Sequence, residues 1–167
     1  KEKILAKKKI KVFSDLKKAI DFKKCDIALI TTPYSERSKI FDQIKNEVKG
    51  IYFEKPFALT NEEHQYFSNS FEKYAITIGY QRRHMGVVKT VKNIIDKNLL
   101  GPVVSVEINF GDVHYSFGGF RSDKKKSGGG IFFETGSHWI DAVLFTTSAK
   151  DVKNFKSEKK IEDNLDI

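Results

Sequence analysis

Short hydrophobic runs in the first half of the chain predict buried strands. Residues 26–31 and 51–53 are nearly all apolar, and a third run follows at 75–79. Runs of this length without polar alternation are typical of strands buried on both faces, as in a parallel sheet. Pro33 and Pro56 follow the first two runs closely and end them.

Apolar positions at helical spacing lie between these runs. They predict one helix over 15–24, capped by Ser14, and another over 36–48. The buried face of the second helix is predicted to hold Ile40, Phe41, Ile44 and Val48. Thr60 with Glu63 makes a capping box for a third helix. Strands that alternate with helices over short connections predict βαβ units in an α/β fold, a partial doubly wound parallel sheet.

The pattern changes after residue 83. A helix is predicted over 87–98, and a Leu-Leu-Gly-Pro sequence closes it. Residues 103–110 alternate between apolar and more polar positions, which suits a strand with one packed face. A loop rich in glycine, serine and lysine, 111–127, leads into a last helix.

The last helix carries an acid and a base. Glu134, His138 and Asp141 follow three glycines at i, i+4 and i+7 and are predicted to share one helix face. An acid one turn from a histidine is a candidate orienter and base. A histidine satisfied within the core is the alternative. Asp141, paired with a backbone group, and Trp139, in the core, are expected to be structural.

The carboxyl ends of the predicted strands are rich in polar residues. They carry Thr31-Thr32-Pro33, Glu54-Lys55-Pro56 and the sequence Tyr-Gln-Arg-Arg at 80–83. In open parallel sheets, ligands bind at this edge. Lys55 could be a solvated loop lysine, but the proline after it favours a fixed turn. Turns at such sites also favour a cis Lys55–Pro56 bond.

Composition narrows the class of protein. A chain of 167 residues with 40% hydrophobic residues can bury a core, and no apolar run approaches the ~20 residues that span a bilayer. No signal peptide is visible at the start. The single cysteine, Cys25, excludes an internal disulfide framework, fits a reducing cytoplasm and is expected to be a small buried hydrophobe. We expect no membrane partner.

The chain is basic, with a net charge of +8. A nucleic-acid-binding domain is one interpretation, and steeply salt-dependent DNA binding would support it. The lysines are scattered, however, and no basic run interleaves with aromatics, which favours solvated lysines, a preference for phosphate-bearing ligands and no nucleic-acid partner. His64, His84 and His114 show no metal-ligand spacing, so no metal is expected.

None of the 11 glycines forms the G-x-G-x-x-G turn that opens a doubly wound nucleotide-binding domain. The chain begins at what resembles the end of the second βα unit. We therefore expect an interior fragment or an incompletely represented chain.

The order of these motifs resembles a known family. From about residue 10, "TTP", "EKP", "YQRR", "LLGPV", "FRSDKKKSGGGIFFETGSHWID" and "IEDN" follow one another as in the glucose–fructose oxidoreductase, inositol dehydrogenase and rhizopine-catabolism family. The resemblance implies that 1–80 is the C-terminal part of a dinucleotide-binding domain. It also implies that 81–167 begins an α+β domain, whose largely antiparallel open sheet often mediates homo-oligomerisation.

The resemblance also implies roles for single residues. Lys55 matches the lysine of E-K-P, which contacts the substrate and the nicotinamide ribose, and His138 matches the proton acceptor or donor. Glu134 occupies the position of an aspartate and is one methylene longer. Residues that the resemblance places at the cofactor are Thr32, Pro33, Glu54, Gln81, Arg83 and Arg121. Arg37 stands where a histidine is common.

These matches imply an oxidoreductase that uses NAD or NADP. Its substrate would carry a CH–OH or ketone group on a sugar, an inositol or a nucleotide-linked sugar. We expect His138 to act as general base, Lys55 as its electrostatic partner and Glu134 as orienter or substrate-hydroxyl ligand. A non-catalytic sensor that binds the dinucleotide on the same fold is the alternative, and the presence of both Lys55 and His138 argues against it.

Overall fold

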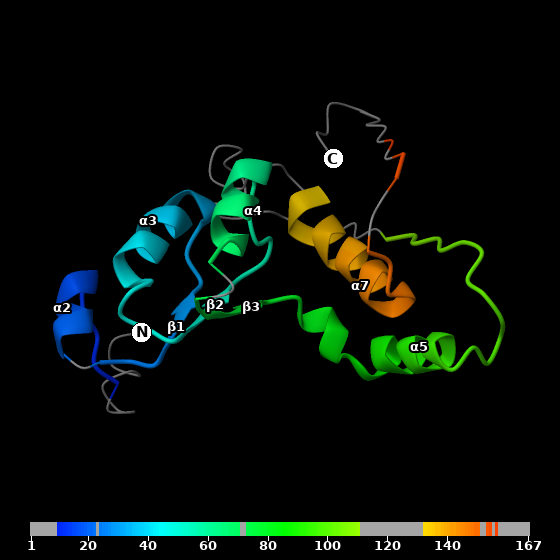
Figure 1. Ribbon diagram of the computed structural model, residues 1–167, viewed down its shortest axis with the longest axis horizontal. Helices are drawn as coiled ribbons and strands as arrows, with labels where there is room; N and C mark the ends of the chain where they lie inside the picture. The colour runs from blue at the N-terminus through cyan, green and yellow to red at the C-terminus, as the bar shows by residue number, and fades with distance from the viewer. Residues whose placement is uncertain are drawn as a thin grey trace. The chain divides into compact units, whose positions relative to one another are not determined.

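The computed structural model describes residues 10–22, 24–70, 73–110, 132–150, 153–154 and 156 (Figure 1). The chain divides into two compact units. The first contains the described residues up to Phe53 together with Thr60–Thr77, and the second contains Glu54–Leu59 and the described residues from Ile78 onward.

A three-stranded sheet in the order β1-β2-β3 organises the first unit. Its strands are Ile27–Ile30, Gly50–Phe53 and Ala75–Ile78. β1 runs parallel to β2, with Ile30 opposite Phe53. The three predicted strands and the parallel sheet are therefore confirmed.

Three α-helices accompany this sheet: α2 (Leu16–Phe22), α3 (Tyr34–Ile44) and α4 (Asn61–Ser68). The predicted Ser14 cap of α2 is wrong by one residue, because Asp15 Oδ1 accepts the N–H of Lys18 at 2.9 Å. A carboxylate at this position also interacts favourably with the helix dipole. The predicted Thr60 cap of α4 is confirmed, since Thr60 Oγ1 accepts the N–H of Glu63 at 3.2 Å.

Aromatic side chains form the core of the first unit. Phe41, Phe53 and Phe67 are fully buried, with ring centroids 4.9 to 5.8 Å apart. Because Phe53 of β2 contacts a ring from α3 and a ring from α4, both helices cover the same face of the sheet (Figure 1). The buried face of α3 is Tyr34, Arg37, Phe41 and Ile44, so two of the four predicted core positions are confirmed.

The opposite face of β1 is open among the described residues. Ile27 and Leu29 are 64% and 68% exposed, whereas Ile30 is buried. Successive side chains of a strand point to opposite faces, and the two helices cover only one of them. The prediction that β1 is buried on both faces is therefore wrong. Cys25, just before this strand, is exposed rather than buried.

The second unit is helical in its described part. A 3₁₀ turn, η1 (Gln81–His84), leads into α5 (Gly86–Asp96), and a π-helical segment, η3 (Phe132–Gly136), leads into α7 (Ser137–Thr147). α5 packs on α7. Lys92 strengthens this packing, because its Nζ donates to Ser148 Oγ at 3.0 Å and lies 5.3 Å from the centroid of the Phe145 ring.

The predicted strand at 103–110 is not formed in the described residues. Residues 101–110 belong to no helix or strand, and Val104 is 94% exposed. A strand needs a partner for its backbone N–H and C=O groups, and no described segment supplies one here. Gly101, with φ of 82°, adopts the left-handed conformation that glycine favours and turns the chain after α5.

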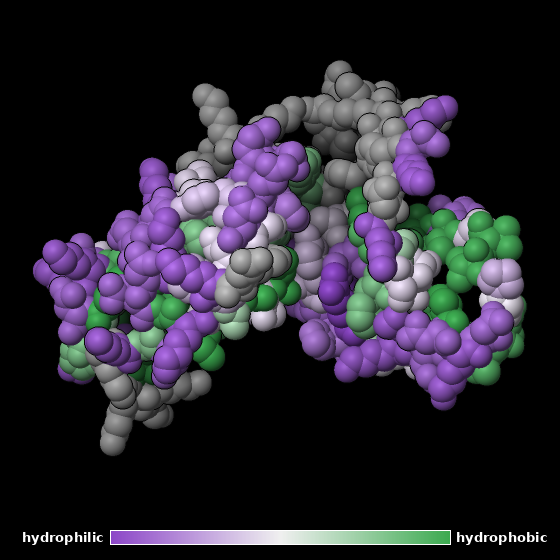
Figure 2. Space-filling view, viewed as in Figure 1, coloured by the Kyte–Doolittle hydropathy of each residue, from purple (hydrophilic) through white to green (hydrophobic). Residues whose placement is uncertain are grey.

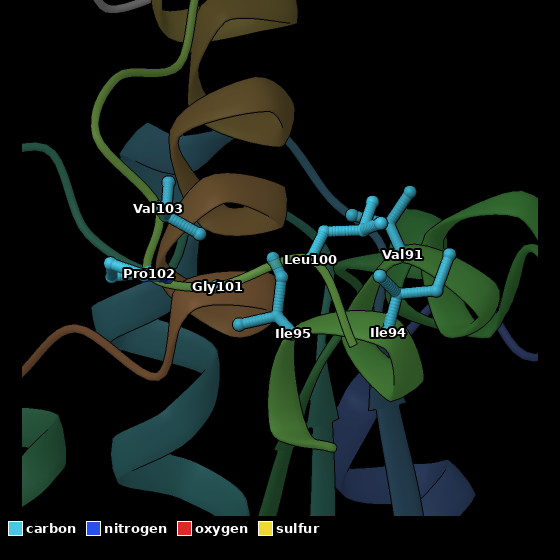
Figure 3. A pocket seen from close by; sticks show the side chains of 7 residues that line it. All are labelled: Val91, Ile94, Ile95, Leu100, Gly101, Pro102 and Val103. Carbon is cyan, nitrogen blue, oxygen red and sulfur yellow. The ribbon is translucent and has the colours of Figure 1, made fainter. Parts of the chain in front are cut away.

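Apolar side chains gather where α5 ends (Figure 2). Leu99 and Leu100 are 61% and 86% exposed. A cavity of about 290 Å³ lies beside them (Figure 3). It is lined by Val91, Ile94, Ile95, Leu100, Gly101, Pro102 and Val103. Within the part of the chain that the structure describes, no helix is long and apolar enough to cross a membrane.

Candidate active site

Lys55 and Glu134 meet in the second unit although they are 79 positions apart in the sequence. Lys55 lies two residues after the end of β2 and is joined to Pro56 by a cis peptide bond. Its Nζ lies 3.0 Å from Oε1 of Glu134 and donates to the backbone carbonyl of Glu134 at 2.6 Å. Both side chains are only 13% exposed. The ammonium of Lys55 is thus held by a main-chain and a side-chain oxygen of one residue.

The helix that carries Glu134, His138 and Asp141 is not uniform. Glu134 lies in η3, and α7 begins only at Ser137. At the junction Ser137 Oγ donates to the carbonyl of Phe133 at 2.7 Å. A π turn has more residues per turn than an α-helix, so the simple i, i+4, i+7 face predicted from the sequence does not describe this segment. π turns of this kind occur frequently at functional sites.

His138 is buried next to this ion pair. It is 8% exposed, and its Nδ1 has no hydrogen-bond partner among the residues that the structure describes. The ring of Tyr80 meets its ring edge to face, with centroids 6.3 Å apart. Burial lowers the pKa of His138, the charges of Lys55 and Arg82 lower it further, and two carboxylates oppose the shift in part. A neutral imidazole at neutral pH is the form that accepts a proton.

Asp141 is paired with Arg83. The Nε of Arg83 donates to both carboxylate oxygens, at 3.1 and 2.9 Å, and Nη2 also donates to Oδ1. The Asp141 side chain is 7% exposed, and hydrogen bonding to it raises the pKa of Arg83. The prediction of a backbone partner for Asp141 is therefore wrong. A forked guanidinium satisfies a buried carboxylate better than one N–H does, and here it fixes η1 on α7.

Arg82, which precedes Arg83 in η1, is a site residue that the sequence did not predict. Its guanidinium carbon lies 3.8 Å from the centroid of the Trp139 ring. Nε of Arg82 and Nε1 of Trp139 are both buried, and neither has a hydrogen-bond partner in the described part of the chain. Trp139 is half-buried and carries this stacked cation rather than belonging wholly to the core. Two adjacent arginines at a strand end are the signal that could have found Arg82.

The remaining predicted site residues fall in different places. Thr32 and Pro33 belong to the first unit, where Pro33 occupies the N-cap position of α3 and Thr32 Oγ1 is buried without a hydrogen-bond partner among the described residues. Arg37 is buried beside them, and its Nε donates to the carbonyl of Thr32 at 3.4 Å. In the second unit, Glu54 and Gln81 are half-buried and exposed, respectively. Arg121 lies outside the described residues.

No group of three or more His, Cys, Asp or Glu side chains that could hold a metal ion occurs among the residues the structure describes. The cluster around His138 therefore consists of side chains that exchange protons or carry charge: Lys55, Arg82, Glu134, His138 and the Arg83–Asp141 pair. This arrangement can remove a proton from a hydroxyl group and stabilise the resulting negative charge.

The lowered pKa of His138 predicts a pH dependence of stability. As pH falls below about 6.5, the usual value for histidine, the unfolded chain takes up this proton before the folded chain does. The free energy of unfolding should therefore fall as pH decreases from 7 towards 5, a range that includes the usual pKa of histidine. Denaturant titrations of wild type and His138→Gln at several pH values measure it. The variant should lose part of the dependence, and His84→Gln, which removes an exposed histidine of η1, should retain it.

A family of known proteins matches the second half of the chain. Residues 88–163 match the GFO/IDH/MocA C-terminal domain. An uncharacterized oxidoreductase of Schizosaccharomyces pombe is 29% identical over 159 residues, which cover 91% of this chain and 43% of the yeast protein. The chain spans less than half the length of the curated relatives that it matches.

Solved structures share the fold. A putative NADPH-dependent oxidoreductase from Desulfitobacterium hafniense superposes with a TM-score of 0.71 at 22% identity, over 87% of this chain and 43% of that one. The WlbA dehydrogenase from Chromobacterium violaceum, solved with NADH and UDP-GlcNAcA, gives a TM-score of 0.68 at 17% identity, over 87% and 44%. These likenesses show that the chain has the α/β fold of dinucleotide-dependent oxidoreductases. Together with the domain match over residues 88–163 and the curated relatives, these structures support membership of the GFO/IDH/MocA family.

Proposed function

We propose that this chain carries the reacting centre of a nicotinamide-dependent oxidoreductase that interconverts a hydroxyl and a ketone on a carbohydrate. The observation that supports it most is a buried His138, whose Nδ1 has no partner among the described residues, beside a Lys55 held by Glu134. A neutral base and a fixed cation close together suit the removal of a proton from an alcohol.

His138 would take the hydroxyl proton of the substrate, because its lowered pKa keeps the imidazole neutral at neutral pH. Lys55 would stabilise the developing alkoxide with its ammonium group. Glu134 would hold Lys55 in place through its carboxylate and its carbonyl. In this arrangement Glu134 orients the lysine, so its extra methylene serves the contact with Nζ.

NAD or NADP would accept the hydride from the substrate carbon. The chain offers features that fit such a cofactor. Thr32 and Pro33 form the turn between β1 and α3, at the carboxyl edge of a parallel sheet, where dinucleotides bind in this class of fold. Thr32 Oγ1 is buried without a partner there, and a hydroxyl or amide group of a ligand could satisfy it. Glu54, Gln81, Arg83 and Arg121 remain proposed cofactor contacts.

The substrate is proposed to be a sugar, an inositol or a nucleotide-linked sugar. Relatives support this choice, since one neighbouring structure contains UDP-GlcNAcA and another is named a putative myo-inositol dehydrogenase. The test is an assay of the intact protein with NAD or NADP and a panel of such compounds. Formation of the reduced cofactor with at least one compound is expected. Tight binding of the dinucleotide without turnover of any of them would favour the non-catalytic sensor.

A further inference from the structure

Arg82 is the charged residue of the cluster around His138 that lacks an opposite charge among the described residues. Lys55 is paired with Glu134, and Arg83 is paired with Asp141. Arg82 instead stacks on Trp139, and its Nε donates to nothing. Its positive charge is close enough to His138 to lower the pKa of that imidazole. The cluster therefore carries one uncompensated cation next to the proposed base.

Trp139, on which Arg82 stacks, also lacks a hydrogen-bond acceptor among the described residues. Nε1 of Trp139 is a donor only, and it is buried without an acceptor. A buried donor left unpaired costs free energy, and native proteins rarely keep two of them together without a reason. Stacking also fixes the plane of the guanidinium, so that its terminal nitrogens are oriented before any ligand arrives. Arg82 as a whole is only half-buried, so an anionic group with several acceptor oxygens could approach the accessible part of its guanidinium and compensate the charge.

We propose that Arg82, stacked on Trp139, binds an acidic substituent of the substrate, a carboxylate or a phosphate, and so selects acidic sugars over neutral ones. The proposal rests on the proposed function, because it places the acidic group on the molecule whose hydroxyl His138 would deprotonate. Arg82 and His138 belong to contacting elements of one unit, η1 and α7. The phosphates of the dinucleotide are the other source of such a group.

Trp139 provides a direct test, since it is the single tryptophan of the chain. Its fluorescence is measured during titration with D-glucuronate, D-glucose 6-phosphate, D-glucose and ADP-ribose. At least one of the two acidic sugars should give a saturable change that weakens moderately with added salt, because a half-buried ion pair is screened less than an exposed one. D-glucose and ADP-ribose should give little change.

Arg82→Gln should weaken binding of the acidic sugar about tenfold or more, the usual cost of a charge-assisted contact. Lys89→Gln, which removes one positive charge from an exposed position of α5, should bind as wild type does. Trp139→Phe checks that the signal comes from this ring. Circular dichroism establishes that each variant is folded, and a variant of Arg82 that does not fold is replaced by Arg82→Lys, which keeps the charge but loses the planar fork.

Three results would overturn the proposal: no change with either acidic sugar, an equal response to D-glucose, or unchanged binding by Arg82→Gln. A response to ADP-ribose alone would assign Arg82 to the cofactor. The titration needs no turnover, so its outcome is separate from that of the redox assay. If the protein bound the acidic sugar through Arg82 but had no redox activity, the proposed function would be contradicted. The assignment of Arg82 as a binding residue would still hold.

Discussion

Replacing His138 by alanine is expected to lower the turnover number of the intact protein by about 10²–10⁴-fold, the usual contribution of a general base. The substrate hydroxyl would then lose its proton to water, which is a weaker base at a less favourable position. KM should change much less than kcat, because the imidazole acts on the proton in the transition state of its transfer. Steady-state rates of cofactor reduction at saturating substrate measure the effect.

His84→Ala is the matched control for this variant. His84 lies in η1 and is exposed, so its removal should leave kcat near that of wild type. A His138→Ala protein that is folded and turns over at a near-normal rate would remove His138 from the proposed mechanism. Thermal unfolding of both variants separates loss of chemistry from loss of structure.

Lys55→Met is expected to lower kcat by about 10²–10³-fold, as removal of one group that stabilises an oxyanion does. Methionine keeps most of the volume of the side chain but supplies no charge, and Glu134 loses the ammonium that its two oxygens now bind. The pH dependence of kcat checks the assignment. His138 should titrate at higher pH in this variant, because the charge of Lys55 lowers its pKa in wild type.

Lys89→Met, on the exposed side of α5, controls for the loss of one positive charge from the chain. It should leave both kcat and its pH profile unchanged. If Lys55→Met raised KM alone and kept kcat, Lys55 would be a substrate-binding residue and not the group that stabilises the alkoxide.

The sequence predicted the local elements of the first unit well. Its strands and helices are short and follow clear apolar patterns, so spacing alone identified all three strands and the helices between them. The cap at Thr60 was predicted correctly because threonine just before a helix is a preferred N-cap residue. The burial of β1 was predicted less well, because periodicity shows that a strand is apolar but not whether a second layer covers it.

The second unit depended more on contacts distant in sequence. Residues 103–110 have a strand pattern but no partner among the described segments, and a pattern cannot supply one. The sequence identified Lys55, Glu134 and His138, and the resemblance to a family gave them roles. It could not show that the longer side chain of Glu134 reaches Lys55, because that contact joins residues 79 positions apart. Arg82 was missed since the partner that the described residues give it is an aromatic ring.

The most direct test of the central claim is single-turnover reduction of NAD or NADP by the intact protein and by its Lys55→Met/His138→Ala double variant. Cofactor binding is measured on the same samples. We predict that the wild type reduces the cofactor with an accepted carbohydrate, while the double variant binds the cofactor and reduces it at no more than the background rate. A folded double variant that reduces the cofactor at a near-normal rate would contradict the account.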